Sequence, residues 1–403
     1  MPGPTVKARL PKAVYWFGAT SLANDVASEM IYPLLPAFVT GVLGGGALAL
    51  GVLDGAADTV AAGFKLLSGY LADRPRLRGP LVVAGYAIAA AVRPLIAIAG
   101  AAWHVIALRA ADRVGKGIRT APRDTMIADV TPSEIRGRAF GLHRAADHVG
   151  AIVGPLSAAG LIYAGVAMRT VFWAAAVPGV VAVGLAWMAV RAAGGGSSVV
   201  GGGKNDSPAA HNLQPANTRF APMIWVLAGA AALRAPETLL ILRAQDLGVP
   251  VALVPILWAA LHVVRSSASY PGGTLADRWG PRRTLALGWA IYAVLAVAFG
   301  LVHTAPAAWA IFLAFGVFVG FTESPERKLV AELAPGGRRG RGFGWYHGAL
   351  SAVALPGAAL FGWLYQSRGA GLAFEVSAAA TVLATLALPL SSSASAPRSR
   401  TAT

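Results

Sequence analysis

Residues 122–141, PRDTMIADVTPSEIRGRAFG, reappear in altered form as residues 325–344, PERKLVAELAPGGRRGRGFG. The two stretches are 203 positions apart and share two prolines, an acidic position and an arginine-glycine-arginine triplet. A second pair, GYLADR at 69–74 and GTLADR at 273–278, is 204 positions apart. Two matches at nearly one spacing indicate an internal duplication. The chain is therefore predicted to contain two copies of one structural unit.

The composition is that of a membrane protein. Hydrophobic residues make up 56% of the 403 residues and charged residues 13%, whereas a soluble domain has about 25% charged residues. A helix needs roughly 20 mainly apolar residues to cross the hydrocarbon layer. Twelve segments fit this description, at about 13–39, 46–71, 79–100, 102–126, 138–164, 170–190, 221–243, 247–271, 283–303, 306–328, 342–366 and 370–390.

One long connection, after the sixth predicted span, separates the two copies. It is rich in glycine, serine, asparagine and proline, which is typical of a flexible linker. We predict an N-terminal six-helix bundle at 1–191, a cytoplasmic linker at 192–219, a C-terminal six-helix bundle at 220–391 and a disordered cytoplasmic tail at 392–403.

Basic residues are distributed unequally between the two sets of connections. Twenty-three Lys and Arg residues fall on the side that holds both termini and the linker, and three, Arg169, Arg243 and Arg368, fall on the other. Cytoplasmic connections carry the excess of Lys and Arg. We therefore predict a multi-pass protein of the cell inner (plasma) membrane with both termini in the cytoplasm. Membrane topology explains the net charge of +16, so nucleic acid is not an expected partner.

These features predict an all-α membrane protein with twelve transmembrane helices, arranged as two six-helix pseudo-symmetric bundles around a central cavity. Repeats of this kind place a substrate path at their interface and open it alternately to either side of the membrane. The expected partners are a small-molecule substrate and the lipid bilayer. The functional unit is expected to be a monomer.

The loop after the eighth span, GTLADRWGPRR at 273–283, resembles the signature loop of the major facilitator superfamily. The first-half copy, GYLADRPRLRG at 69–79, departs from that pattern because Arg76 replaces its second glycine. We expect the first glycine of each copy to permit close helix approach and each aspartate to meet a helix N-terminus or a basic neighbour. The arginines either form gating salt bridges or only set the topology. The candidate gating residues are Gly69, Asp73, Arg74, Gly273, Asp277, Arg278 and Gly280.

Two further stretches are similar to motifs of this superfamily. Arg113-Val-Gly-Lys-Gly117 in the fourth span is similar to its Arg-x-x-x-Gly pattern, and this resemblance implies a role for Arg113 in proton coupling. In the fifth span, Gly150, Gly154 and Pro155 resemble a motif of the exporting branches, although alanines replace its final glycine pair. Small residues four apart allow close helix packing and proline kinks a helix. Packing alone is therefore the alternative explanation of this motif.

Ionisable side chains recur at helical spacing within the predicted spans, where each costs at least ~2.5–3.5 kcal/mol at the bilayer centre. Asp25 and Glu29 are four apart in the first span, and Asp54 and Asp58 are four apart in the second. Such stripes must face a polar cavity or one another. The candidate cavity residues are Asn24, Tyr32, Asp54, Arg109, Asp112, Lys116, Arg234, Glu237, Trp258, His262 and Arg265.

We predict that protons are a second partner and that four charged residues couple them to transport. A carboxyl group partly removed from water can exchange protons near neutral pH, and a neighbouring arginine opposes its protonation. Asp25, Glu29 and Asp58 are the candidate proton acceptors, and Arg113 is the candidate coupling arginine. The alternative is that each acid forms a permanent buried ion pair that only fixes helix register.

Missing motifs argue against several functions. The sequence has no Gly-x-x-x-x-Gly-Lys-Ser/Thr phosphate loop, no His-Glu-x-x-His and no cysteine, so neither ATP hydrolysis, nor another enzyme activity, nor a metal or other cofactor is expected. The predicted function is a secondary active transporter that exports a small organic molecule in exchange for protons. The alternatives are proton-coupled import of a polar metabolite or organic ion, and a sensor or scaffold that does not transport.

Overall fold

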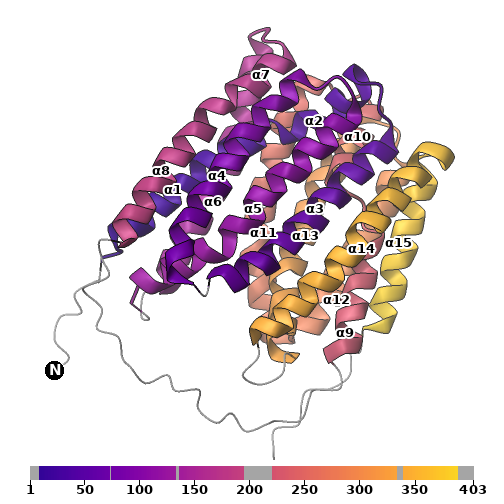
Figure 1. Cartoon of the computed structure of the whole chain (residues 1–403). Coiled ribbons are helices and arrows are strands. Elements are labelled where there is room, and N and C mark those ends of the chain that lie inside the picture. Colours follow the sequence, from indigo (N-terminus) through magenta and orange to yellow (C-terminus); the bar gives the residue numbers. More distant parts are fainter. Residues whose placement is uncertain (1–8, 73, 133–135, 195–219, 334–338, 389–403) are drawn as a thin grey trace, which may run out of the picture.

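The computed structural model describes residues 9–72, 74–132, 136–194, 220–333 and 339–388, and every secondary-structure element within these ranges is helical. Figure 1 shows the two halves of the chain side by side, the first in indigo to magenta and the second in orange to yellow. The predicted tail, the gating candidate Asp73 and all of the predicted linker beyond residue 194 lie outside the described residues.

The N-terminal half contains the first six predicted spans. The first is α1 (Lys12–Glu29), followed by the short elements η1 (Tyr32–Leu34), α2 (Leu35–Ala37) and η2 (Phe38–Val42). Prolines at positions 33 and 36 interrupt this span, since proline lacks a backbone N–H for helix hydrogen bonding. The other five spans are α3 (Ala47–Ala72), α4 (Pro75–Leu95) with η3 (Ile96–Ile98), α5 (Ala102–Val130), α6 (Arg136–Tyr163), and α7 (Met168–Ala174) with α8 (Ala176–Gly194).

The C-terminal half repeats this order. Its spans are α9 (Phe220–Ala232) with α10 (Glu237–Asp246), η5 (Val251–Leu253) with α11 (Val254–Trp279), α12 (Pro281–Leu301), α13 (Ala305–Leu333), α14 (Arg339–Arg368) and α15 (Ala370–Ala387). Both α5 and α13 have 29 residues, and they begin and end 203 positions apart. The prediction of two six-helix halves is confirmed.

Most of the twelve spans satisfy the length and composition required to cross a membrane. In the described part of the chain, ten helical segments are long and apolar enough, and the two other spans, α1 and α5, carry several charged residues. Large apolar side chains are exposed on the outer helices, among them Val180 of α8, Val294 of α12 and Leu386 of α15. Such a surface suits contact with lipid, and several charged side chains of α5, among them Arg109, Asp112 and Arg119, are buried.

Turn glycines repeat along with the helices. Gly44 and Gly248, and likewise Gly165 and Gly369, are 204 positions apart, and all four have a positive φ between 66° and 92°. Glycine adopts this conformation without the steric penalty of a Cβ. These four turns lie at one end of the molecule, here called the far end. The opposite end, which carries Lys12 and Arg191, is called the basic end.

The two halves pack along two seams, α3 against α14 and α6 against α11. Glycines allow α3 and α14 to approach each other closely. A Cβ on Gly51 would lie 2.2 Å from the carbonyl oxygen of Ala358, and one on Gly362 would lie 2.5 Å from that of Ala47. The helices therefore touch through their backbones in the far-end half of this seam.

Candidate functional site

A cavity of about 570 Å³ lies between the two halves. The α3 residues that line it run from Asp54 to Lys65, and those of α14 run from Ala358 to His347, so it extends from the middle of the helices toward the basic end. Lys116 and His347 are exposed on its walls. The cavity thus opens to solvent toward the basic end.

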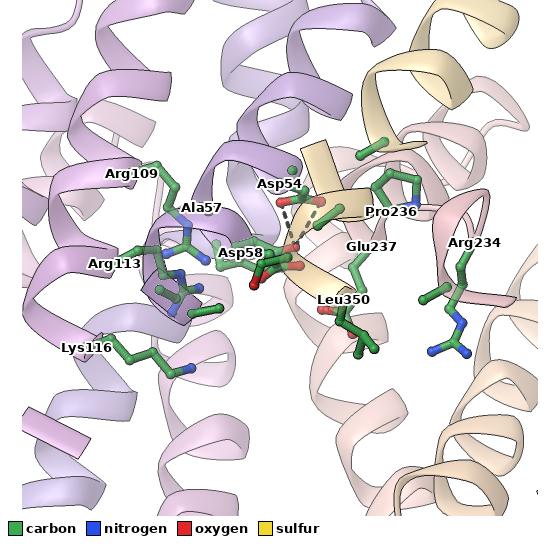
Figure 2. A pocket seen from close by; sticks show the side chains of 18 of the residues that line it. Asp54, Ala57, Asp58, Arg109, Arg113, Lys116, Arg234, Pro236, Glu237 and Leu350 are labelled. Carbon is green, nitrogen blue, oxygen red and sulfur yellow. Dashed lines mark hydrogen bonds between the residues drawn. The ribbon is translucent and has the colours of Figure 1, made fainter. Parts of the chain in front are cut away.

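Three cations of α5 form a row on the cavity wall (Figure 2). Arg109, Arg113 and Lys116 share one helix face because they follow at intervals of four and three residues. On other faces, glycines bring α5 close to its neighbours. A Cβ on Gly115 would lie 2.5 Å from a backbone oxygen of α4, and one on Gly117 would lie 2.4 Å from a side-chain carbon of α3. Close packing on those sides fixes the position of the charged row.

A buried ionic network lies behind this row. Arg93 of α4 donates through Nε to Asp112 Oδ1 at 2.8 Å, and through NH1 to the backbone and side-chain oxygens of Asn24 at 2.9 and 3.1 Å. Arg109 lies 3.5 Å from the other oxygen of Asp112. Asn24 and Asp112 are buried and outside the cavity lining. This corrects their predicted place on the cavity wall, because Arg93 holds both of them inside the N-terminal half.

At its far-end side the cavity is closed by hydrogen bonds between the halves. Asp54 accepts one from the backbone N–H of Thr238 at 3.1 Å and one from its Oγ1 at 2.7 Å. Tyr32 donates to the same carboxylate at 3.2 Å. Glu29 accepts a hydrogen bond from Trp258 Nε1 at 2.8 Å, and the rings of Tyr32 and Trp258 lie 5.1 Å apart. We call these five residues the far-end closure.

The C-terminal wall of the cavity carries paired charges. Arg265 of α11 lies 3.6 Å from Glu237 of α10 and 3.6 Å from Glu323 of α13. Arg234 lies 3.6 Å from Glu326. Each arginine of this wall is thus neutralised by carboxylates of its own half. The predicted cavity residues that line the cavity are Tyr32, Asp54, Arg109, Lys116, Arg234, Glu237, Trp258, His262 and Arg265.

Of the four candidate coupling residues, Glu29, Asp58 and Arg113 line the cavity and Asp25 does not. Asp25 accepts a hydrogen bond from Asn24 Nδ2 at 2.9 Å and faces α6, where a Cβ on Gly150 would lie 2.8 Å from its Cβ. The cavity therefore brings together three of these residues and leaves the fourth in the contact between α1 and α6.

The glycines of α6 fit it closely against α1. A Cβ on Gly154 would lie 2.7 Å from the backbone oxygen of Val26 and 3.1 Å from the Cβ of Glu29. The helix continues through Pro155 to Tyr163. The motif of the fifth span thus contacts the part of α1 that carries the acids.

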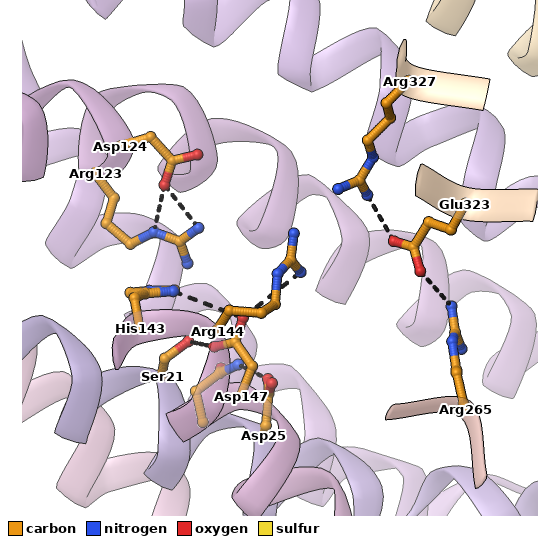
Figure 3. Close-up of polar contacts among 11 residues, drawn as sticks. Ser21, Asp25, Arg123, Asp124, His143, Arg144, Asp147, Arg265, Glu323 and Arg327 are labelled. Carbon is orange, nitrogen blue, oxygen red and sulfur yellow. Dashed lines mark hydrogen bonds and ion pairs between the residues drawn. The ribbon is translucent and has the colours of Figure 1, made fainter. Parts of the chain in front are cut away.

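A second polar cluster ties α6 to α1 nearer the basic end (Figure 3). Ser21 donates a short hydrogen bond to Asp147, and the same carboxylate lies 3.6 Å from His143 and 3.8 Å from Arg144. Across the picture, Glu323 of α13 pairs with Arg265. The sequence analysis did not select Asp147, although it is an acid within a predicted span.

The candidate gating glycines lack the predicted close contacts. A Cβ on Gly69 or on Gly273 would meet no atom within 4 Å, which corrects their predicted role in helix approach. The contact belongs to Gly272, whose Cβ would lie 2.3 Å from a backbone oxygen of α13. Asp277 has the expected basic neighbour, because Lys328 Nζ lies 2.5 Å from its Oδ1.

The two signature loops turn differently. Gly280 has a φ of 87° at the start of α12, a conformation that favours glycine. In the first half, Arg74 precedes α4 with an ordinary φ of −95°, and Pro75 begins the helix. The first turn therefore does not need the glycine that Arg76 replaces. Arg74 and Arg278 are both exposed at the basic end.

Three further polar residues line the cavity that the sequence analysis did not select. Lys65 lies seven residues after Asp58 on α3, so helical spacing already placed it on the same stripe. His347 and Ser351 of α14 also line the cavity, and Ser351 accepts a hydrogen bond from Thr59 at its carbonyl oxygen. No charge pattern distinguishes these two residues in the sequence.

Comparisons with known proteins agree with this architecture. Residues 17–265 and 223–402 each match the model of the Major Facilitator Superfamily. An uncharacterised protein of Mycobacterium tuberculosis is 32% identical over 363 residues, which cover 87% of this chain and 86% of the relative. An uncharacterised MFS-type transporter of Methanocaldococcus jannaschii is 27% identical over 367 residues, which cover 89% of each.

The fold also matches a solved structure. A bacterial homologue of the human lysosomal transporter Spinster, in an inward-facing and unoccupied conformation, has a TM-score of 0.71 and 15% sequence identity, covering 93% of this chain and 94% of that one. Two six-helix repeats around a polar cavity define a multi-pass membrane transporter rather than an enzyme. The chain belongs to the Major Facilitator Superfamily.

Proposed function

We propose that the protein is a proton-coupled antiporter of the inner membrane that exports a small organic molecule by alternating access. The far-end closure carries this proposal. In it, carboxylates of the N-terminal half, Glu29 and Asp54, accept hydrogen bonds from Trp258 and Thr238 of the C-terminal half. Groups that can take up protons therefore also join the two halves at one end of the cavity.

Protonation of these carboxylates would weaken the closure. Hydrogen bonds to an ionised acceptor are roughly twice as strong as those to a neutral one. Proton uptake by Glu29 or Asp54 is therefore linked to opening at the far end, and closure is linked to proton release. Asp58 and Arg113 line the same cavity and complete the coupling group. Asp25 contributes through the contact of α1 with α6.

One observation supports export. Gly150 and Gly154, which resemble the motif of exporting branches, pack against the segment of α1 that carries Asp25 and Glu29. The cavity opens at the basic end, where the excess of Lys and Arg predicts the cytoplasm, and a state open on that side belongs to the cycle of an exporter and of an importer alike. We also propose that both termini lie in the cytoplasm, that the functional unit is a monomer, and that the domain boundaries are those predicted from the sequence.

Transport in proteoliposomes tests this proposal. Solutes that raise the melting temperature of the purified protein are selected first, because ligands that bind the folded state stabilise it. Each is then loaded into vesicles with an imposed pH gradient. We expect the solute to move against the proton flow. In the variants Glu29→Gln and Asp58→Asn, solute movement should no longer depend on the pH gradient. In Glu375→Gln, which removes an exposed carboxylate of α15, that dependence should remain.

Other outcomes identify the alternatives. Solute movement in the same direction as the protons would replace export by proton-coupled import. A solute that binds but never crosses the membrane would favour the sensor function. Unchanged gradient dependence in both variants would contradict the assignment of the coupling residues.

A further inference from the structure

Half of the six Lys and Arg residues on the cavity wall have an acidic partner in the described part of the chain. Arg109 lies 3.5 Å from Asp112, and Arg234 lies 3.6 Å from Glu326. Arg265 lies 3.6 Å from each of two carboxylates. These three arginines are therefore largely neutralised before any solute enters.

Three other cations of the wall have no carboxylate within 4 Å among the described residues. Arg113 and Lys116 belong to α5 and Lys65 belongs to α3, and all three line the cavity. The two helices touch here, because Ser68 Oγ donates to the carbonyl oxygen of Gly117 at 2.8 Å. Lys65 and Lys116 are each within three residues of that contact. The cations thus form one cluster, named the free cation cluster.

One cation of this cluster also has an unsatisfied donor atom. The Nε atom of Arg113 is buried and has no hydrogen-bond partner. A buried polar group costs free energy when it lacks a partner, and a charge costs more. An anion bound in the cavity would compensate the positive charge of the cluster.

The acids that face the cluster do not neutralise it. Glu29 and Asp54 line the same cavity, but each accepts hydrogen bonds from the other half at the far-end closure. Asp58 also lines the wall and forms no ion pair within 4 Å in the described part of the chain. Three cations thus face one unengaged carboxylate, so this part of the cavity favours an anion.

The wall across from α5 includes apolar side chains, mostly alanines, beside the paired charges described above. Those that line the cavity from α9 and α14, with the segment before α10, are Ala231, Ala232, Ala235, Leu350, Ala354 and Ala358. Figure 2 shows the row of α5 on one side of the cavity and Leu350 toward the other. A ligand that spans the cavity therefore meets unpaired cations on one side, and on the other side alanines next to the paired charges of Arg234 and Arg265.

We propose that the transported molecule is an organic anion. Its oxyanion head, a carboxylate or a phosphate, binds Arg113, Lys116 and Lys65, and its apolar body lies against the alanine-rich wall. This inference rests on the transport function proposed above, for which it names the substrate class.

Binding to the purified full-length protein in detergent tests the inference without a proton gradient. The probes share one ring and differ in the head group: benzoate, phenyl phosphate, neutral benzamide and cationic benzylamine. We expect benzoate or phenyl phosphate to bind at least about tenfold more tightly than benzamide, since hydrogen bonds to charged groups are the stronger ones. The stronger of the two anions identifies the head group.

Variants locate the binding. Lys116→Gln should weaken binding of the preferred anion about tenfold and Lys116→Arg should retain it, because the second change keeps the charge. Arg76→Gln removes an exposed cation outside the cavity and should leave the affinity unchanged. The melting temperature without ligand shows whether each variant is folded.

Several results would overturn the inference. These are failure of both anions to bind, equal binding of benzoate and benzamide, tighter binding of benzylamine, or an unchanged anion affinity in Lys116→Gln. Anion binding without proton exchange would support an organic anion as the ligand and contradict proton-coupled antiport. Proton-driven flux of a neutral solute would keep antiport and contradict the inference.

Discussion

The indole Nε1 of Trp258 in α11 lies 2.8 Å from the carboxylate of Glu29 in α1, and this hydrogen bond crosses from one six-helix half to the other. Tyr32 packs its ring beside the same indole, with the ring centroids 5.1 Å apart. One side chain of the C-terminal half therefore contacts both a charged and an aromatic residue of the N-terminal half. Trp258 thus joins the two halves at the far-end closure.

Trp258→Phe should shift the protein toward a state that is open at the far end. The change keeps an aromatic ring but removes the N–H that binds Glu29, and a hydrogen bond to a charged group contributes about 1.5–3 kcal/mol. The chain has no cysteine, so spin labels can be placed at Val42→Cys and Leu253→Cys, two exposed far-end positions in different halves. We expect the long-distance population between these labels to grow roughly tenfold or more, in line with that free energy.

The matched control is Trp225→Phe, because Trp225 is an exposed indole of α9. It should leave the distance distribution as it is in the parent. Identical distributions for Trp258→Phe and the parent would show that the hydrogen bond does not hold the far end closed.

Gly55→Ala should destabilise the seam between the halves. A Cβ at this position of α3 would lie 2.7 Å from the Cα of Leu355 in α14, so the helices must move apart. Overpacking of this kind costs about 1–3 kcal/mol. Gly63→Ala, in the same helix, meets no atom within 4 Å and should raise stability by about 0.5–1 kcal/mol through helix propensity. Melting temperatures of the two purified variants should move in opposite directions. Equal shifts would show that the close contact of Gly55 with α14 does not stabilise the protein.

The helices and the two halves could be predicted because their signals are long and repeated. Apolar length defines each span, and the duplication appears again in turn glycines such as Gly44 and Gly248, 204 positions apart. The row of Arg109, Arg113 and Lys116 could also be predicted, since helical spacing alone places these residues on one face.

Partners on other helices could not be predicted in this way. Asp112 shares α5 with the cavity row, but Arg93 of α4 binds it on the buried side, and spacing within one helix does not show this contact. Thr238 was not selected because a neutral hydroxyl has no charge pattern, yet it binds Asp54. The glycine contact near the second signature loop fell one residue away, at Gly272 instead of Gly273, because neighbouring helix positions point in different directions.

Arg93→Met should destabilise the N-terminal half strongly. It leaves the carboxylate of Asp112, which is 1% exposed, without its closest cation. Removing one partner of a buried ion pair costs about 3–5 kcal/mol. Asp129→Asn removes an acid that is 56% exposed and pairs with Arg78, so it should cost less than about 1 kcal/mol.

Thermal unfolding of both variants in one detergent measures this difference. The double variant Arg93→Met with Asp112→Leu should recover only part of the loss. It removes the isolated carboxylate, but Arg109, whose side chain is 4% exposed, then loses its partner at 3.5 Å. Equal melting temperatures for Arg93→Met and Asp129→Asn would show that the buried network does not stabilise this half.

Gly154→Ala should impair transport by displacing α1. The added Cβ would lie 2.7 Å from the backbone oxygen of Val26 and 3.1 Å from the Cβ of Glu29, so the segment that carries Glu29 must shift away from α6. Because Glu29 binds Trp258, this shift weakens the far-end closure, and roughly tenfold slower gradient-driven flux follows if a hydrogen bond of about 1.5 kcal/mol is lost.

Gly160→Ala is the matched control for Gly154→Ala, since a Cβ at Gly160 of the same helix meets no atom within 4 Å. Its flux should equal that of the parent. The distance between the labels at positions 42 and 253 should broaden in Gly154→Ala alone. Normal flux and an unbroadened distance between the two labels in Gly154→Ala would show that the glycine motif of α6 does not affect the far-end closure. The motif would then serve only the packing of the N-terminal half.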